Sequence, residues 1–279
     1  MIRFENLNFK YRRRPVLFDG LSLSLDGGHI HGLLGLNGAG KTSLMKIAMG
    51  MLFPKEGACR VLGYESCKRQ PAMLADMIFV PEEFYAPDMT IGRYADLYAP
   101  FYPAFSHEQF QAYMNELGLC DGEHFNSFSL GQKKKAVLAF ALAANTRVLL
   151  MDEPTNGLDI PSKAQFRRML ASVATDDRCI VISTHQVRDV EKLIDSVLML
   201  DHGQITLNRS IEEITAKISF CTVPELSGQE LYSESSLAGY QVLLPNVDGE
   251  PTQIDLELFF NALINNRQAI QNIFNQLNF

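Results

Sequence analysis

The chain opens with alternating apolar and polar positions over residues 1–30. The run Leu21-Ser22-Leu23-Ser24-Leu25 alternates strictly and is followed by the turn sequence Asp26-Gly27-Gly28. Strict alternation is typical of a strand with one buried face, and turns between such segments favour antiparallel pairing. We therefore expect an antiparallel β subdomain at the start of the chain.

Later strands are predicted by short, continuous apolar runs instead of alternation. Polar turns bound the runs at residues 147–151 and 179–183, and residues 29–34, 77–80 and 197–200 are further candidates. Continuous runs of this length are typical of strands buried on both faces of a parallel sheet. The predicted fold class is therefore α/β, with a mostly parallel sheet.

Two helical regions separate these strands. Residues 41–51 have a helix-favouring composition that ends near Gly50 and Pro54. Residues 84–145 are rich in aromatic side chains and show helical periodicity. We expect this second region to form a helical subdomain inserted between two strands of the sheet.

The composition changes beyond residue 217, where Ser, Asn, Gln and Pro become more frequent. We place a boundary there, between a main domain at residues 1–216 and a small C-terminal α+β appendage at residues 217–279. Residues 240–244 predict a strand, and apolar residues between Leu256 and Ile264 recur at helical spacing. We expect this helix to pack its apolar face on the main domain; a partner-binding surface is the alternative.

Charge and length exclude some classes of partner. The chain has 279 residues, 47% of them hydrophobic, and a formal net charge of -7. An acidic chain has no general electrostatic attraction to nucleic acid, so we expect no nucleic-acid partner.

The sequence predicts neither a secretory signal nor a membrane span. Residues 2–7 alternate between apolar and polar and lack the basic and apolar regions of a signal peptide. The best uncharged apolar run, residues 136–144, is far shorter than the roughly 20 residues that span a bilayer. We expect a cytoplasmic protein that is attached to the inner face of the cell membrane only through a partner.

The five cysteines fit neither a disulfide framework nor a zinc site. They are an odd, scattered set without a C-x-x-C pair. We expect reduced and mostly buried thiols at Cys59, Cys67, Cys120, Cys179 and Cys221.

A glycine-rich loop follows the strand expected at residues 29–34. Its sequence, Gly35-Leu36-Asn37-Gly38-Ala39-Gly40-Lys41-Thr42, fits the phosphate-binding pattern G-x-x-x-x-G-K-[ST] and leads into a helix. Glycines let backbone N–H groups approach an anion, and the helix N-terminus favours negative charge. Lys41 is expected to contact the β- and γ-phosphates, and Thr42 to ligate Mg²⁺. The predicted nucleotide-binding residues here are Gly35, Leu36, Asn37, Gly38, Ala39, Gly40, Lys41, Thr42 and Ser43.

Two carboxylates end the apolar run at residues 147–151. Strands of an open α/β sheet present their carboxyl ends to ligands, so both acids are expected to face the nucleotide. Asp152 is then a candidate for holding the hydrated Mg²⁺ ion, and Glu153 for polarising the attacking water. By itself such a pattern is common, and its value lies in its combination with the phosphate loop.

Together these segments resemble the ATP-binding-cassette ATPase family. The motifs are Phe128-Ser129-Leu130-Gly131-Gln132, then Asp152-Glu153-Pro154-Thr155-Asn156-Gly157-Leu158-Asp159, then Ser183-Thr184-His185. The resemblance covers about residues 1–215. It implies a P-loop NTPase core with an antiparallel β subdomain and a helical signature subdomain, and an ATPase subunit of a transporter, more similar to the exporter type.

The resemblance also implies roles for residues outside the phosphate loop. In this family the signature segment of one subunit caps the γ-phosphate that the other subunit holds, so ATP lies at a two-fold interface. Ser129, Gly131 and Gln132 match that contact, and Asp159 matches a residue that communicates between subunits. His185 matches the histidine that stabilises the transferred phosphate, which makes Glu153, His185 and Lys41 the predicted catalytic residues. Tyr11 matches the aromatic residue that stacks on adenine.

The chain departs from the family pattern at Glu82, at Phe128 and Leu130 of the signature, and at residues 133–135. Glu82 stands where many relatives place a glutamine that touches the metal; a carboxylate can still ligate Mg²⁺, so the predicted metal ligands are Thr42, Glu82 and Asp152. Leu130 replaces a glycine of the signature. Residues 133–135 are three lysines, which we interpret as a solvated helix face.

Three functions compete for these motifs. The first is an ATP-hydrolysing subunit that dimerises around two Mg-ATP, as a homodimer or with a paired cassette, and drives a separate membrane permease. The second is a soluble, non-transport cassette ATPase that acts as a mechanical clamp; the short segment between Thr42 and Ser129 lacks the sustained heptads of such relatives. The third is a sensor that does not hydrolyse ATP, which the presence of Glu153 and His185 disfavours.

Overall fold

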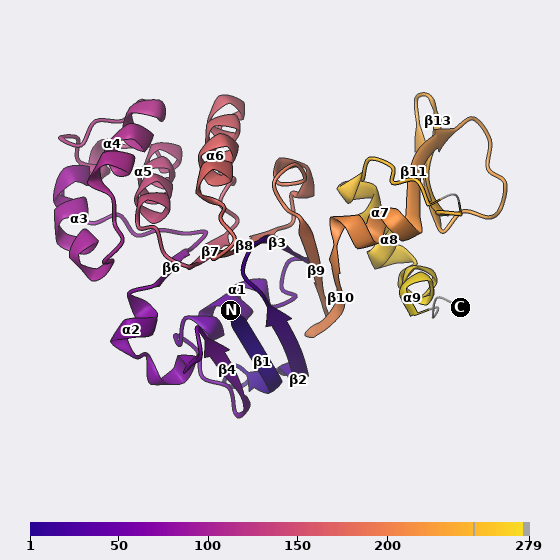
Figure 1. Cartoon of the computed structure of the whole chain (residues 1–279), viewed down its shortest axis with the longest axis horizontal. Helices are drawn as coiled ribbons and strands as arrows, with labels where there is room; N and C mark the ends of the chain where they lie inside the picture. The colour runs from indigo at the N-terminus through magenta and orange to yellow at the C-terminus, as the bar shows by residue number, and fades with distance from the viewer. Residues whose placement is uncertain (248, 276–279) are drawn as a thin grey trace.

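The computed structural model describes residues 1–247 and 249–275 of the chain. Its central element is a six-stranded sheet in the order β10-β9-β3-β8-β7-β6, seen nearly edge-on in Figure 1. All strands run parallel except β10, which pairs antiparallel with β9. The strands are β3 (His29–Leu34), β6 (Met77–Val80), β7 (Val148–Asp152), β8 (Cys179–Thr184), β9 (Ser196–Asp201) and β10 (Gln204–Ser210). The predicted α/β class with a mostly parallel sheet is confirmed.

A four-stranded antiparallel sheet in the order β2-β1-β4-β5 contains the N-terminal strands. The alternation of the sequence appears in its burial, with Ile2 and Phe4 buried in β1, and it shifts by one residue at an irregularity around the left-handed Asn6, after which Leu7 and Phe9 are buried. The strands are β1 (Ile2–Lys10), β2 (Val16–Leu25), β4 (Glu56–Val61) and β5 (Tyr64–Glu65). The antiparallel β structure predicted for residues 1–30 is therefore present.

The six-stranded sheet is buried on both faces. Val148 and Leu150 of β7 pack in a cluster with the antiparallel sheet and α1 (Lys41–Ala48), whereas Leu149 and Met151 pack in a second cluster with the later helices. Neighbouring residues of one strand thus face two different apolar layers, which explains why these strands are continuous apolar runs in the sequence.

The segment between β6 and β7 is helical and lies beside α6, above one end of the sheet in Figure 1. It fills the region that we predict as helical, residues 84–145. The helices here and on either side are α2 (Pro71–Leu74), α3 (Ile91–Tyr98), α4 (His107–Glu116), α5 (Leu130–Ala143) and α6 (Ile160–Val173), with 3₁₀ turns at Ser66–Lys68, Ala99–Phe101, Phe125–Ser127 and Val187–Asp189.

The C-terminal segment forms a small three-stranded sheet with helices, beyond β10 in Figure 1. Its elements are α7 (Ile211–Lys217), β11 (Ile218–Val223), β12 (Tyr232–Ser236), β13 (Gly239–Pro245), α8 (Leu256–Asn265) and α9 (Arg267–Asn275). Helix α8 contacts β12 and β13, and it also contacts the 3₁₀ turn Val187–Asp189 of the main sheet region. Its apolar face is therefore used inside the chain. The division into two domains near residue 217 remains a proposal.

The expectation that the thiols are mostly buried is wrong. Cys67, Cys120 and Cys221 are exposed, and only Cys59 and Cys179 are buried, so the thiols are not mostly buried. Burial raises the pKa of the Cys59 and Cys179 thiols to about 12.

Within the described residues, no helix combines the length and the hydropathy that crossing a bilayer requires.

Candidate nucleotide-binding site

The predicted phosphate-loop and catalytic residues meet at the carboxyl ends of β3, β7 and β8. Leu34, the last residue of β3, pairs with Thr184 of β8, and Asp152 of β7 pairs with Ser183 of β8. The residues that follow each strand are therefore brought to one edge of the sheet, where open α/β folds bind their ligands.

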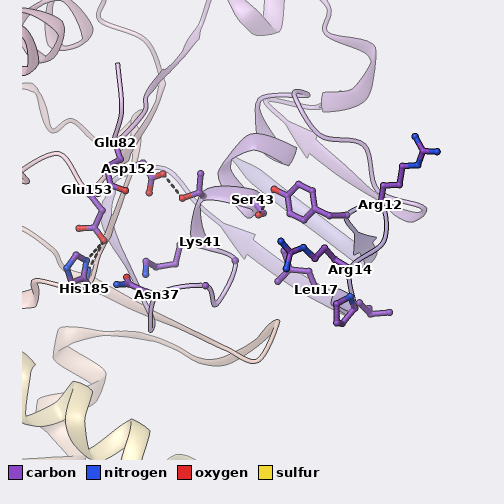
Figure 2. A pocket seen from close by; sticks show the side chains of 16 residues that line it. Arg12, Arg14, Leu17, Asn37, Lys41, Ser43, Glu82, Asp152, Glu153 and His185 are labelled. Carbon is purple, nitrogen blue, oxygen red and sulfur yellow. Dashed lines mark hydrogen bonds and ion pairs between the residues drawn. The ribbon is translucent and has the colours of Figure 1, made fainter. Parts of the chain in front are cut away.

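A cavity of about 1030 Å³ opens at this edge (Figure 2). Figure 2 shows Lys41, Glu153 and His185 at one end and Arg12, Arg14 and Ser43 at the other. The cavity is lined by Tyr11, Arg12, Arg14, Pro15, Val16, Leu17, Asn37, Gly38, Gly40, Lys41, Thr42, Ser43, Glu82, Asp152, Glu153 and His185. Of the predicted phosphate-loop residues, Gly35, Leu36 and Ala39 lie outside this lining.

The phosphate loop holds Lys41 folded back over its own backbone. The Lys41 ammonium donates to the carbonyl oxygens of Gly35 at 2.6 Å and Leu36 at 3.3 Å. Burial lowers the pKa of Lys41, and the carboxylates of Glu153, Asp152 and Glu82 oppose that shift. The acceptors of the Lys41 ammonium in the described structure are backbone carbonyls. Its positive charge is therefore available to an anionic ligand.

Gly40 precedes α1 in a left-handed conformation, with φ of 111°. A Cβ atom at this position would lie 2.9 Å from the Phe18 ring, so both the backbone and the available space require glycine. The loop is thereby held close to β2 while the N-terminus of α1 faces the cavity.

Asp152 is the acceptor in a pair of hydroxyl hydrogen bonds. Thr42 Oγ1 donates to Asp152 Oδ2 at 2.6 Å, and Ser183 Oγ donates to Asp152 Oδ1. The carboxylate is only 2% exposed. The phosphate loop and β7 are therefore joined through two hard oxygen atoms, the kind of atom that Mg²⁺ prefers.

Glu153 and His185 form the second polar pair of the cavity. His185 Nδ1 lies 2.7 Å from Glu153 Oε1, and the same oxygen accepts the backbone N–H of His185 at 3.0 Å. The other oxygen, Oε2, accepts from Thr184 Oγ1 at 3.0 Å. Glu153 has a left-handed backbone with φ of 45°, which for a non-glycine residue costs on the order of 1–3 kcal/mol. Thr184 of β8 and His185 after it therefore fix the position of the Glu153 carboxylate, whose own backbone is strained.

Tyr11 lies at the other end of the cavity, tied to the phosphate-loop helix. Its hydroxyl oxygen is 2.9 Å from Ser43 Oγ, and its ring packs edge-on against Phe9 at a centroid distance of 5.0 Å. The side chain remains 40% exposed. An aromatic ring that is fixed at its edge and open on a face can stack on a planar base.

The signature residues do not reach this cavity. Ser129 caps α5: its Oγ accepts the N–H of Gln132 at 3.3 Å, and Gln132 Oε1 accepts the N–H of Ser129 at 3.0 Å. A Cβ atom at Gly131 would lie 2.7 Å from the carbonyl oxygen of Gly157, so α5 packs directly on the loop after Glu153. Leu130, which departs from the family pattern, is 68% exposed.

Asp159 also lies outside the cavity. Its side chain caps α6 by accepting the Ser162 N–H at 2.8 Å, and hydrogen bonds from Ser162 lower the pKa of the Asp159 carboxyl. Ser129, Gly131, Gln132 and Asp159 thus do not line the cavity that holds the phosphate loop of the same chain.

The interpretation of residues 133–135 as a solvated face is wrong for Lys134. This side chain is 7% exposed, and its Nζ donates to the carbonyl oxygen of Glu153 at 2.5 Å. Lys133 and Lys135 are intermediate in exposure. Glu82 lines the cavity and accepts from Asn156 Nδ2 at 3.0 Å. Sequence reasoning missed Lys134 and Asn156, because nothing in the spacing distinguishes either from its polar neighbours.

Comparisons with known proteins agree with this geometry. The sequence profile of the ABC transporter family matches residues 18–156. The chain is 28% identical over 269 residues to the ABC transporter ATP-binding protein YtrB of Bacillus subtilis strain 168, covering 92% of this chain and 91% of that protein. It is 30% identical over 202 residues to the ABC transporter ATP-binding protein NatA of the same organism, covering 70% of this chain and 82% of NatA.

A solved structure shares the fold. It is a dimeric structure of a post-hydrolysis state of the ATP-binding cassette MJ0796 bound to ADP and Pi, with a TM-score of 0.67 and 20% identity over 75% of this chain and 98% of that one. A phosphate loop, a pair of carboxylates at the end of one strand and a histidine after the neighbouring strand lie together in this fold. The chain belongs to the family of ABC transporter ATP-binding proteins, and these relatives do not favour the non-transport clamp.

Proposed function

We propose that this chain hydrolyses ATP as one half of a head-to-tail cassette dimer that drives a separate membrane permease. The observation that supports this most is the division of the predicted site into two parts. The phosphate loop, Asp152, Glu153 and His185 share one cavity, whereas the signature residues Ser129 and Gln132 lie outside it. A second copy, or a paired cassette, would supply the missing part.

Mg²⁺ fits the oxygen atoms at the phosphate end of the cavity. Thr42 Oγ1, Asp152 Oδ2 and the carboxylate of Glu82 would hold the hydrated ion together with oxygens of the ATP phosphates. The ion would neutralise negative charge on the β- and γ-phosphates. Mg²⁺ in phosphate sites usually takes only one or two protein carboxylates, which this arrangement provides.

The protein groups would divide the hydrolysis step between them. Glu153 would accept a proton from the attacking water as the water oxygen bonds to the γ-phosphorus. The bond between the γ-phosphorus and the bridging oxygen would break, and ADP and phosphate would remain. Lys41 would leave its carbonyl acceptors for the phosphates, and His185, already hydrogen-bonded to Glu153, would stabilise the charge on the γ-phosphate. Tyr11 would stack on the adenine base.

The partner's signature would close the site. Ser129 Oγ accepts one hydrogen bond in this structure, and its own proton remains available to donate to a phosphate oxygen. The N-terminus of the 14-residue helix α5 adds a positive dipole end facing the same direction. Binding of two ATP molecules would thus draw two chains together, and hydrolysis would release them.

The permease partner would dock on the helical region near Glu82. Large apolar side chains are exposed there: Tyr85 is 92% and Phe101 66% exposed. Exposed aromatic residues are typical of surfaces that a partner covers. Replacement of both by Asp should release the protein from native membranes, whereas the control Leu237→Asp on the C-terminal sheet should remain bound; equal retention of all variants would contradict this docking surface.

The dimer mechanism is tested by ATP hydrolysis as a function of protein concentration, with light scattering to count subunits. The wild type should show specific activity that climbs as dimers form with Mg-ATP. Glu153→Gln should form dimers and lose turnover by about 100-fold or more, while the control Glu83→Gln, at an exposed carboxylate in the loop after β6, should behave as the wild type. Full turnover in Glu153→Gln would show that Glu153 does not activate the attacking water.

A further inference from the structure

Lys134 is a buried cation that the assigned mechanism leaves without a role. It lies on α5, one turn after the signature residues, and is 7% exposed. A buried ammonium is costly unless it is hydrogen-bonded, so its retention within an apolar helix needs a reason. The neighbouring α5 residues Ala136, Val137 and Leu138 are also buried, and none of them provides a polar partner.

The ammonium meets the main chain of the water-activating residue. Lys134 Nζ donates to the carbonyl oxygen of Glu153 at 2.5 Å. The charges that surround it are the carboxylates of Glu82, Glu153 and Asp152, which face the same cavity. Lys134 therefore does not line the cavity itself. It contacts the site through the backbone carbonyl of Glu153.

The peptide that Lys134 holds is a strained one. Glu153 has φ of 45°, a conformation that persists only where the surroundings hold it. Its N–H donates to the carbonyl of Ser183 at 3.0 Å, and its carbonyl also accepts the N–H of Asn156 at 3.2 Å. Lys134 is thus the side chain that fixes the carbonyl end of this residue, while β8 fixes the amide end.

The same helix touches the same loop at a second point. Gly131 lies so close to Gly157 that a Cβ atom would come within 2.7 Å of the Gly157 carbonyl oxygen. The first turn of α5 is therefore connected to the loop after β7 by a tight backbone contact and by a charged hydrogen bond. A displacement of the signature end of α5 would move this loop with it.

We propose that Lys134 is a positioning residue that holds the Glu153 backbone in its active conformation and thereby links the signature helix to the water-activating carboxylate of the same chain. Contact of Ser129 and Gln132 with the partner's nucleotide sets the position of α5. Lys134 transmits that position to Glu153, so each chain hydrolyses its own ATP efficiently only when its signature is engaged. The inference depends on the proposed function, because it requires Glu153 to activate water in a dimer.

The experiment compares Lys134→Met, which removes the donor, with Lys134→Arg, which keeps a cationic N–H donor on the same helix. Lys133→Met is the matched control, since Lys133 is half-exposed on the neighbouring position. ATP affinity and Mg-ATP-dependent dimerisation should be unchanged in all variants. Turnover per dimer should fall about 30-fold in Lys134→Met with an unchanged KM, because misplacement of a catalytic group by about 1 Å costs on the order of 100-fold. Lys134→Arg should recover to within about 5-fold of the wild type, and Lys133→Met should match the wild type.

A double-mutant cycle with Glu153→Gln separates positioning from general loss of structure. If Lys134 acts only through Glu153, adding Lys134→Met to Glu153→Gln should not lower the residual turnover further than about two-fold. A multiplicative loss, or wild-type turnover in Lys134→Met, would overturn the inference while leaving the dimer mechanism intact. Undiminished turnover in Glu153→Gln alone would instead overturn the proposed function itself.

Discussion

His185 Nδ1 lies 2.7 Å from Glu153 Oε1, and the backbone N–H of His185 donates to the same oxygen. One residue after β8 thus binds the carboxylate after β7 in two ways, and both residues line the cavity. Under the proposed function, Glu153 would orient this ring for an interaction with the γ-phosphate.

Replacement of His185 by Ala should lower kcat about 100-fold, because both charge stabilisation and the orientation of Glu153 are lost. The affinity for ATP should change little, since Lys41 and the phosphate loop are untouched. Steady-state hydrolysis and nucleotide titration separate the two quantities. His107→Ala, at an exposed position of α4, is the control; a His185→Ala enzyme with normal kcat would rule out this role.

The bond of 2.6 Å between Thr42 Oγ1 and Asp152 Oδ2 predicts a change in the Mg²⁺ requirement. Thr42→Val keeps the shape of the side chain and removes its ligand oxygen. The Mg²⁺ concentration that gives half-maximal hydrolysis should rise about 10-fold, since the loss of a ligand oxygen is similar in size to the loss of a hydrogen bond to a charged group. Thr222→Val, on an exposed position of β11, should leave the Mg²⁺ titration unchanged. Equal titrations for Thr42→Val and the wild type would exclude Thr42 as a ligand.

Sequence patterns predict the parts of this protein that local rules determine. The phosphate loop is recognisable because the glycine at residue 40 and the lysine after it must stand at fixed positions between a strand and a helix. The strands of the main sheet are recognisable because burial on both faces removes polar residues from them. The positions of Asp152 and Ser183 at one sheet edge then follow from parallel pairing.

Contacts between distant segments could not be read in the same way. Residues 133–135 are all lysines, and only the packing of α5 against the loop after β7 makes Lys134 buried and its neighbours half-exposed. The hydroxyl contact between Tyr11, the residue after β1, and Ser43 of α1 spans 32 residues and has no sequence signal. Strand β12 also has no recognisable sequence pattern, because its residues are polar or half-buried.

The packing of α8 predicts that the C-terminal segment contributes to stability. Phe259 is fully buried, and its ring lies 6.2 Å from that of Phe220 in β11. Phe259→Ala should lower the free energy of unfolding by about 3–5 kcal/mol through the loss of buried surface and the cavity left behind. Leu237→Ala, at a fully exposed position, should be neutral. Chemical denaturation measures both, and equal stability of the two variants would mean that α8 does not pack as described.

His31 predicts how the stability of the fold depends on pH. Burial lowers the pKa of His31 below its ordinary value of 6.5; His29 adds to this shift, and Asp195 and Asp26 oppose it. The ring is 4% exposed, and its Nε2 lies 3.2 Å from the carbonyl oxygen of Asp26. Its Nδ1 is buried and has no hydrogen-bond partner among the described residues. The folded chain therefore favours the neutral imidazole.

The sign of the effect follows from proton binding. Below pH 6.5 the unfolded chain takes up a proton at this histidine and the folded chain does not, so stability is lost as the pH falls from 6.5 through the lower folded pKa. His31→Gln keeps a donor for the Asp26 carbonyl and removes the titration, so its melting temperature should fall less than that of the wild type between pH 7 and about pH 5. His29→Gln serves as the control, because His29 is half-exposed and paired with Asp195. Thermal melts across this pH range test the assignment. A smaller fall in melting temperature for His31→Gln alone would assign the acid sensitivity to the buried His31 ring. Equal falls for the wild type and His31→Gln would show that another group governs it.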